Sequence, residues 1–320
     1  MTGAGAPDSE VRMDGFINLL KPPGMTSSDA VVYVRKRLPR GTKVGHAGTL
    51  DPEAAGVLPV MVGRAARLSD YIMDGEKEYV CEIALGVATD TQDAQGAQVG
   101  ARCAPASGAE LRAALPAFTG RIMQTPSAFS ALKVGGRKMC DILRAGGEVA
   151  PQPRPVTIHE LEYLGMSAPD GHMLRIRCSK GTYIRALCDD IGRALGCGAH
   201  MRFLLRTLSA GFALDAAHTL EELDADLAGC LTPLDLPIAH IPAVLAGADM
   251  YARVRCGNRL PLSALRGDLG EGVRRLYVRR DAQPPCDVGG AIPEGYGFAG
   301  IVERDGEEMR FRAMLLEAED

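Results

Sequence analysis

The chain has 320 residues, of which 46% are apolar, and a formal net charge of −4 at pH 7. This length predicts one domain of usual size and a smaller one, and the apolar content allows a substantial core. A negative net charge is not that of a generic nucleic-acid binder and argues against RNA as a partner. A polyanion would have to bind to a local basic surface.

Charge is distributed unevenly along the chain. Residues 31–43 carry five basic side chains and no acidic one, and residues 175–206 carry seven basic and two acidic ones. Residues 214–236 carry six acidic side chains and no Lys or Arg. This separation allows a basic face that contacts phosphates. The alternative is that each run is an ordinary solvated surface, and charge alone does not decide between the two.

The cysteines and the N-terminal residues indicate the compartment. The nine cysteines are an odd number and include no Cys-x-x-Cys pair, which argues against a structural zinc site and a closed disulfide framework. The first thirteen residues lack the basic start and apolar core of a signal peptide, and no run of about 20 apolar residues is present. We therefore expect a cytoplasmic protein with reduced thiols and no membrane segment.

The expected elements of the first third begin with a loose tail over residues 1–13. A strand is expected over 16–20, followed by a helix that begins near Thr26. Residues 64–73 have the pattern of a short helix, and the alternation over 79–85 predicts a strand.

The middle of the chain mixes helices and strands in an irregular order. A helix is expected near 107–115, strands are expected at 156–158 and 174–178, and residues 182–195 form an amphipathic helical pattern. This order predicts an α+β core built on a mostly antiparallel sheet.

The last part of the chain predicts a second unit. The acidic stretch and the Pro/Ala-rich run over 233–247 mark a boundary, after which short strands alternate with glycine turns, as in a small β-barrel. We expect a first domain over 14–247 and a second over 248–320.

Residues 45–59, GHAGTLDPEAAGVLP, contain one aspartate within a run rich in glycine and proline. Pro52 disfavours the helical region for Asp51, and the glycines allow tight turns, so the acid could lie at the tip of a stiff loop. The alternative is a helix start, with Asp51 as N-cap and Pro52 at the first helical position. Such a helix would meet Gly56 and Pro59 within two turns.

The run over 45–52, together with GVLP at 56–59, closely resembles the catalytic loop of the TruB family. These are bacterial tRNA pseudouridine-55 synthases, which isomerise a uridine in the T-loop. The resemblance covers residues 15–212 well and 253–320 loosely. GFAGIVE at 297–303 resembles a strand of the PUA module, an RNA-binding barrel. The resemblance implies a pseudouridine-synthase catalytic domain on a mixed sheet, followed by a PUA-like barrel.

The implied reaction breaks the C1′–N1 bond of a flipped uridine and joins C1′ to C5 of the same base. The sequence has no phosphate loop, dinucleotide fingerprint or metal-ligand cluster, so no cofactor and no metal are expected. The isomerisation requires a nucleophile that holds one fragment while the base rotates. Asp51 is the candidate, and attack at the sugar C1′ and at the base C6 both remain open.

Two further residues match catalytic positions of the family. Arg185, in SKGTYIR at 179–185, would pair with Asp51, although a helix-surface pair with Asp189 is the alternative. Tyr79 matches the active-site tyrosine, although it could be a core residue. Because its hydroxyl has an ordinary pKa of ~10, it is a poor base at neutral pH. We expect it mainly to stack on the uracil, and which group removes the C5 proton stays open.

The resemblance also suggests residues that bind the RNA. Tyr183 and Leu204 would shape the base slot, although Leu204 could be a core residue. His46 would insert into the T-loop, and Lys21 would support the catalytic loop.

Lys133 and Arg137 lie in and beyond QTPSAFSALK at 124–133, a family segment for tRNA contacts. The chain departs from the family pattern at three positions: Ser127 stands where proline is usual, Cys140 where tyrosine is usual and Leu205 where arginine is usual. These departures put local RNA contacts in question, not the chemistry. The expected partner is the T-arm of tRNA, with the acceptor end at the C-terminal barrel and no obligatory protein partner.

Other functions remain as alternatives. An RNA-binding or tRNA-folding protein without turnover would use the same surface, but it would not need Asp51. A guide-dependent enzyme would need partner-binding extensions, and none is recognised. A glycoside hydrolase using Asp51 and Glu53 is disfavoured, because residues two apart in a short loop rarely face a substrate from opposite sides.

Overall fold

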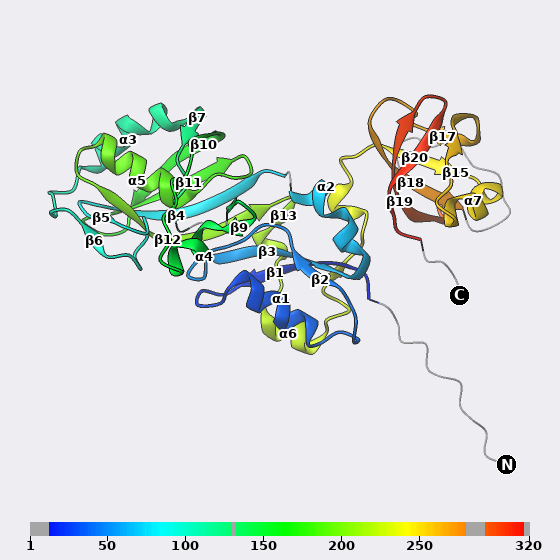
Figure 1. Ribbon diagram of the computed structural model, residues 1–320, viewed down its shortest axis with the longest axis horizontal. Helices are drawn as coiled ribbons and strands as arrows, with labels where there is room; N and C mark the ends of the chain where they lie inside the picture. Colours follow the sequence, from blue (N-terminus) through cyan, green and yellow to red (C-terminus); the bar gives the residue numbers. More distant parts are fainter. Residues whose placement is uncertain (1–12, 74, 128, 130–131, 280–291, 317–320) are drawn as a thin grey trace, which may run out of the picture.

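The computed structural model describes residues 13–73, 75–127, 129, 132–279 and 292–316. It contains a large unit on a ten-stranded sheet and a smaller unit on a six-stranded sheet, which lie end to end (Figure 1). Apart from Met13, the tail expected over residues 1–13 lies outside the described residues. No helix in the described part is long and apolar enough to cross a membrane.

The large sheet is mixed and almost entirely antiparallel. The strands in spatial order are β14 (Leu231–Thr232), β1 (Gly15–Lys21), β3 (Ala55–Val62), β12 (Ala199–Ser209), β4 (Lys77–Leu85), β11 (Gly171–Cys178), β10 (Arg154–Met166) and β7 (Gly120–Gln124), with β2 (Val44–His46) beside β3 and β13 (Phe212–Ala213) beside β12. The central β3–β12 pair is parallel and only two residues long, joining Ala55 to Leu205 and Gly56 to Arg206. The α+β prediction is confirmed.

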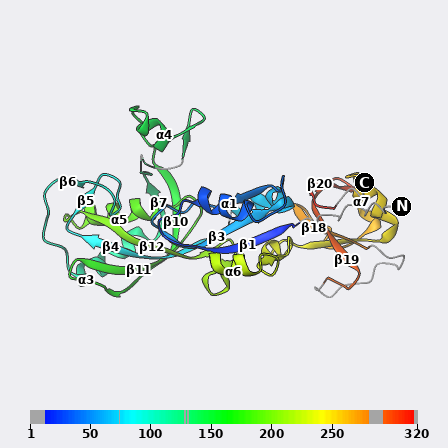
Figure 2. The ribbon, with the colours of Figure 1, turned by 90° about the horizontal axis from the view of Figure 1, so that it is seen from below.

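The helices of the large unit are short. They are α1 (Ser27–Arg35), α2 (Ser69–Met73), α3 (Gly108–Ala114), α4 (Met139–Arg144), α5 (Ile184–Ala194) and α6 (Leu220–Ala225), with 3₁₀ turns at Gly63–Leu68, Leu115–Phe118, Leu214–Ala216 and Leu236–Ile238. Small ladders join β5 (Ala88–Thr89) to β6 (Gln98–Val99) and β8 (Lys133–Val134) to β9 (Arg137–Lys138). Figure 2 shows α4 standing out from the large sheet.

Local sequence explains where two of these helices form. Thr26 caps α1, because its hydroxyl accepts from the Asp29 N–H while the Asp29 carboxylate accepts from the Thr26 N–H. In α5 the periodic apolar residues Ile184, Leu187 and Ile191 are buried, as the sequence predicts.

The segment over 45–59 is only partly a loop, which corrects the sequence-based expectation. Strands β2 and β3 take residues 44–46 and 55–62, so the loop is confined to 47–54, and no helix begins at Asp51. Gly56 permits this arrangement: its φ is +109°, and a Cβ there would lie 2.2 Å from the Arg206 carbonyl oxygen. Pro59 lies beyond the last β3 residue that pairs with β12.

The smaller unit is a nearly closed, PUA-like barrel. Its strands in spatial order are β16 (Leu260–Pro261), β20 (Glu308–Met314), β19 (Tyr296–Asp305), β18 (Val273–Arg279), β15 (Ala243–Ala246) and β17 (Leu265–Gly267). Helix α7 (Tyr251–Arg255) and 3₁₀ turns at Ala248–Met250 and Leu262–Ala264 complete it. Because β15 pairs with β17 and β18, the barrel begins a few residues before the boundary expected at 247/248.

The two units share an apolar cluster. Phe16 and Leu68 of the large unit belong to the same buried cluster as Ile301 and Leu315 of the barrel. Arg67 adds a polar contact, because its guanidinium donates to the Met314 carbonyl at 2.5 Å. The interface therefore combines apolar burial with a hydrogen bond to the last strand.

The basic run over 31–43 and the acidic stretch over 214–236 are separate in the sequence but meet in the fold. Arg37, from the basic run over 31–43, pairs with Asp224 from the acidic stretch, and the Tyr33 hydroxyl donates to the same carboxylate at 2.8 Å. The other basic side chains of that run remain exposed. The basic surface near α1 is therefore smaller than the sequence suggests.

Candidate active site

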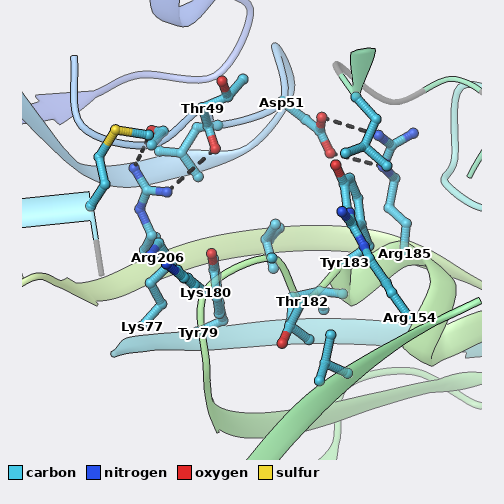
Figure 3. A pocket seen from close by; sticks show the side chains of 18 of the residues that line it. Thr49, Asp51, Lys77, Tyr79, Arg154, Lys180, Thr182, Tyr183, Arg185 and Arg206 are labelled. Atoms are coloured by element: carbon cyan, nitrogen blue, oxygen red, sulfur yellow. Dashed lines mark hydrogen bonds and ion pairs between the residues drawn. The ribbon is translucent and has the colours of Figure 1, made fainter. Parts of the chain in front are cut away.

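The loop over 47–54 forms one wall of a cavity of about 800 Å³. The other walls come from β4, β12, the start of β10 and the start of α5. Figure 3 shows Asp51, Arg185 and Tyr183 on one side, with Tyr79 and Arg206 across from them. Elements distant in sequence thus converge on one carboxylate.

Asp51 is bound by a two-pronged contact from Arg185. Arg185 Nε lies 2.8 Å from Asp51 Oδ2, and Arg185 Nη2 donates to Asp51 Oδ1 at 3.2 Å. The Arg185 side chain is 7% exposed and that of Asp51 is 36% exposed, so a nearly buried cation orients a carboxylate that remains accessible. The alternative pair between Arg185 and Asp189 is wrong, because Asp189 is 2.7 Å from Arg193.

A second carboxylate holds Arg185 from its other side. Arg185 Nη1 donates to Asp93 Oδ2 and to the Thr91 carbonyl, both at 3.2 Å. Gln92 between them has a φ of +66° and donates to Asp189 at 3.0 Å, which fixes this turn against α5. The guanidinium is therefore immobilised between two acids, of which only Asp51 lines the large cavity.

Arg206 holds the catalytic loop from beneath. Its fully buried guanidinium donates to the carbonyls of Val57 at 2.7 Å, Gly48 at 3.0 Å and Thr49 at 3.4 Å. These residues flank Asp51 on both sides, so a single side chain from β12 fixes both ends of the loop.

Lys21 also holds the loop. Its Nζ donates to the carbonyls of Pro52 at 3.0 Å, Pro22 at 2.8 Å and Met25 at 2.7 Å. Burial lowers the pKa of Lys21 to about 8, and nearby Glu53 opposes that shift. The side chain is completely buried and does not line the cavity, so it contacts the loop backbone rather than a ligand.

Three residues shape the interior of the cavity. Tyr79 and Leu204 are each 6% exposed and lie on neighbouring strands, β4 and β12. Burial raises the pKa of Tyr79, while nearby Arg206 opposes that shift, so its phenol is protonated at neutral pH. Tyr183 is fixed by Gln124, whose amide accepts from the Tyr183 N–H at 2.8 Å and donates to its carbonyl at 3.0 Å.

Other expected RNA-binding residues lie outside this cavity. His46 is in β2 and Arg137 is exposed in β9, and neither lines it. The backbone of Lys133 is in β8, but its side chain lies outside the described part, as does that of Cys140. Ser127 is 4% exposed, and its Oγ accepts from the Phe129 N–H at 3.3 Å.

The cavity is strongly basic, and several of its residues were missed from the sequence. Its described lining has five basic side chains and two acidic ones, namely Lys77, Arg154, Lys180, Arg185, Arg206, Asp51 and Asp70. The basic run over 175–206 signalled three of these cations, whereas Lys77 and Arg154 had no comparable signal. The arrangement suits an anionic substrate.

A smaller cavity of about 260 Å³ lies beside the first. Asp51, Arg185 and Leu204 line both, and the smaller one adds Phe129 and Phe203. Among the described residues, no group of three or more His, Cys, Asp or Glu side chains could hold a metal ion.

The fold and the basic cavity agree with the sequence matches. Residues 35–184 match the N-terminal domain of TruB family pseudouridylate synthases, and residues 185–236 match the tRNA pseudouridylate synthase B C-terminal domain. These matches define the class as pseudouridylate synthases. The chain belongs to the TruB family, which confirms the resemblance found from residues 45–59.

Curated relatives support this assignment. The tRNA pseudouridine synthase B of Thiobacillus denitrificans is 44% identical over 308 residues, covering 95% of this chain and 96% of the relative. That of Alkaliphilus oremlandii is 44% identical over 250 residues, covering 78% of this chain and 83% of the relative.

Solved structures share the fold. A Cbf5–Nop10–Gar1 complex contains a chain 26% identical to this one, with a TM-score of 0.65 and coverage of 90% of this chain and 78% of the other. An H/ACA RNP bound to a substrate RNA contains a chain with a TM-score of 0.68, 22% identity and coverage of 95% and 85%. The second comparison concerns the fold alone.

Proposed function

We propose that this protein is a tRNA pseudouridine synthase that isomerises the uridine at position 55 of the T-loop in the bacterial cytoplasm. The observation that carries the proposal is the Asp51 carboxylate, held by Arg185 at the wall of a basic cavity of about 800 Å³. This volume is in the range of sites that enclose a small-molecule-sized group, such as a flipped nucleotide.

In this proposal Asp51 is the nucleophile. It attacks either C1′ of the ribose, displacing N1 of the base, or C6 of the uracil, after which the C1′–N1 bond breaks. The base then turns and C1′ bonds to C5. The bond to Asp51 breaks as C5 displaces the carboxylate from C1′, or by elimination from C6, and the free carboxylate is restored. The proton on C5 is lost and N1 gains one, so the reaction is an isomerisation that needs no external group. Arg185 keeps the carboxylate aimed at the substrate, because both guanidinium contacts fix its orientation.

The base would lie against Tyr79 and Leu204, with Tyr183 at the edge of the slot. The buried phenol of Tyr79 offers an aromatic face, which suits stacking better than proton removal. Arg206 and Lys21 would act indirectly, by holding the loop that carries Asp51.

We propose that the large unit is the catalytic domain, that the barrel is a PUA-like RNA-binding domain, and that the T-arm binds across the catalytic loop. His46 would insert into the T-loop, and Lys133 and Arg137 would contact its phosphates. The acceptor end would reach the barrel. A photoreactive nucleotide at the tRNA 3′ end should then crosslink within residues 243–316, and crosslinks confined to the catalytic domain would contradict this.

Tritium release from C5-tritiated uridine in a tRNA transcript tests the reaction. The wild-type protein should release the label, a transcript lacking the target uridine should not lose it, and Asp51→Asn should bind the T-arm without releasing it. Undiminished release by Asp51→Asn would exclude Asp51 as nucleophile. If the wild-type protein binds the T-arm but releases no tritium, the protein is an RNA-binding protein without turnover.

A further inference from the structure

Arg154 is the first residue of β10 and lines the large cavity. Its guanidinium carbon lies 5.2 Å from the centroid of the Tyr183 ring, a cation–π contact that brings the two side chains together in Figure 3. Its Nε is buried and has no hydrogen-bond partner among the described residues. A guanidinium donor without an acceptor is unusual, because burying an unpaired polar group is costly.

The other cavity cations have acceptors. Arg185 lies between Asp51 and Asp93, and Arg206 donates to three backbone carbonyls. Lys77 donates to the Gly75 carbonyl at 3.2 Å, and Lys180 also has a partner. Arg185 Nε also has no hydrogen-bond partner in the described chain, but it lies 2.8 Å from the Asp51 carboxylate. Within the described lining, Arg154 is therefore the cation without a carboxylate or carbonyl partner, and its donors are available to a ligand.

The position of Arg154 is fixed although its donors are unused. Its backbone pairs with Gln124, the residue whose amide brackets the backbone of Tyr183. The strand, the amide and the aromatic ring thus hold the guanidinium at the cavity wall before any ligand binds. Preorganisation of this kind lowers the entropy lost on binding.

We propose that Arg154 binds a backbone phosphate that flanks the target nucleotide, an inference that rests on the function proposed above. A guanidinium presents a planar fork of donors that matches two phosphate oxygens, and a charged acceptor binds it more strongly than a neutral uracil oxygen does. A nucleotide whose base enters the cavity brings its flanking phosphates to the rim. Arg154 anchors the backbone there while the base reacts.

Neutralising individual phosphates tests this assignment. T-arm hairpins are made with a methylphosphonate either 5′ or 3′ of the target uridine, and their dissociation constants are compared with that of the unmodified hairpin. One of the two changes should weaken binding to the wild type roughly 10-fold, as expected for a lost charge-assisted hydrogen bond. Arg154→Met should bind the unmodified hairpin about 10-fold more weakly and be insensitive to that methylphosphonate.

Arg121→Met is the matched control, because Arg121 is exposed on the adjacent strand β7 and does not line the cavity. It should keep the wild-type sensitivity. Arg154→Lys retains the positive charge but loses the planar pair of guanidinium donors, so the methylphosphonate should weaken its binding less than it weakens binding to the wild type. If Arg154→Met does not fold, Arg154→Lys replaces it in the comparison.

An unchanged methylphosphonate effect in both Arg154 variants would overturn the proposal and assign Arg154 to holding Tyr183. Insensitivity of the wild type to both substitutions would overturn it as well. Wild-type protein that binds the hairpin but releases no tritium would refute the proposed function instead, while the binding comparison would still decide the role of Arg154.

Discussion

The catalytic loop and the surface of the C-terminal barrel use the same residue types in opposite ways. Around the loop, Lys21 and Arg206 are completely buried, and their donors bind backbone carbonyls. In the barrel, Arg259 is 55% exposed, lying 2.9 Å from Asp305 and 3.5 Å from Glu308. The contrast shows that burial and the kind of acceptor determine what an arginine or lysine contributes.

A buried cation bound to carbonyls has no water to replace it. Its loss leaves several acceptors unpaired, and each such vacancy costs about 1–3 kcal/mol. An exposed ion pair loses little when broken, because solvent screens it and replaces the lost partner. The loop should therefore be sensitive to single substitutions, and the barrel surface tolerant of them.

The largest effect is expected for Arg206→Met. The carbonyls of Gly48, Thr49 and Val57 would lose their common donor, so the free energy of unfolding should fall by about 3 kcal/mol. Tritium release should fall by about 100-fold or more, because Asp51 would no longer be fixed. Urea unfolding and single-turnover release measure the two effects.

Arg202→Met is the control for this substitution. It lies on the same strand, but its side chain is 33% exposed and pairs with Glu82 and Asp170 at the surface. Its stability loss should be under about 1 kcal/mol, and tritium release should fall far less than in Arg206→Met. Equal losses in the two variants would show that burial does not separate the two kinds of arginine.

A smaller effect on turnover is expected for Asp93→Asn. The amide preserves the shape of the contact with Arg185 Nη1 but removes the charge opposite Asp51. Tritium release should fall roughly 10-fold, as expected for weakening one charged hydrogen bond, while affinity for the T-arm hairpin stays the same. A loss of affinity with normal single-turnover release would contradict the proposed positioning of Arg185.

The sequence predicted much of this arrangement where local pattern determines structure. The cap at Thr26 and the apolar stripe of α5 gave correct helices, and the resemblance around Asp51 identified the pair with Arg185. The helix expected over 64–73 is instead a 3₁₀ turn followed by the short α2. Periodicity alone does not distinguish these two helix types.

The remainder depends on contacts that local pattern does not encode. Strand β12 was missed because register shifts between Met201 and Phe203 and between Arg206 and Leu208 interrupt its alternation. Gly56, which suggested a loop, permits the close approach of β3 to β12, and Pro59 lies beyond the residues that pair with β12. Asp93 contacts Arg185 only because the turn over 91–93 packs against the start of α5, a contact between segments far apart in the sequence.

His172 is buried like the loop cations, and burial outweighs the opposing effect of the nearby Asp170 carboxylate on its pKa. It is 1% exposed, its Nδ1 lies 3.2 Å from the Tyr163 hydroxyl, and its Nε2 has no hydrogen-bond partner in the described chain. Burial lowers the pKa of His172, so the unfolded chain binds the proton first as the pH falls below ~6.5.

This histidine should therefore make the fold less stable in mild acid. Its contribution to stability is present above pH ~6.5 and is lost as the pH falls through its folded pKa, with a slope of at most about 1.4 kcal/mol per pH unit. His172→Leu should flatten the dependence of urea unfolding on pH between about pH 7.5 and about pH 5.5. Parallel curves for the two proteins would contradict the assignment.

The smallest effect is expected for Arg259→Met in the barrel. The arginine and its partners Asp305 and Glu308 are all at least 40% exposed, so water replaces the lost contacts. The free energy of unfolding should change by less than about 1 kcal/mol, and the difference from wild type should shrink further as salt is added. A loss as large as that of Arg206→Met would mean that the barrel surface is not tolerant. The contrast between buried carbonyl-bound cations and exposed ion pairs would then fail.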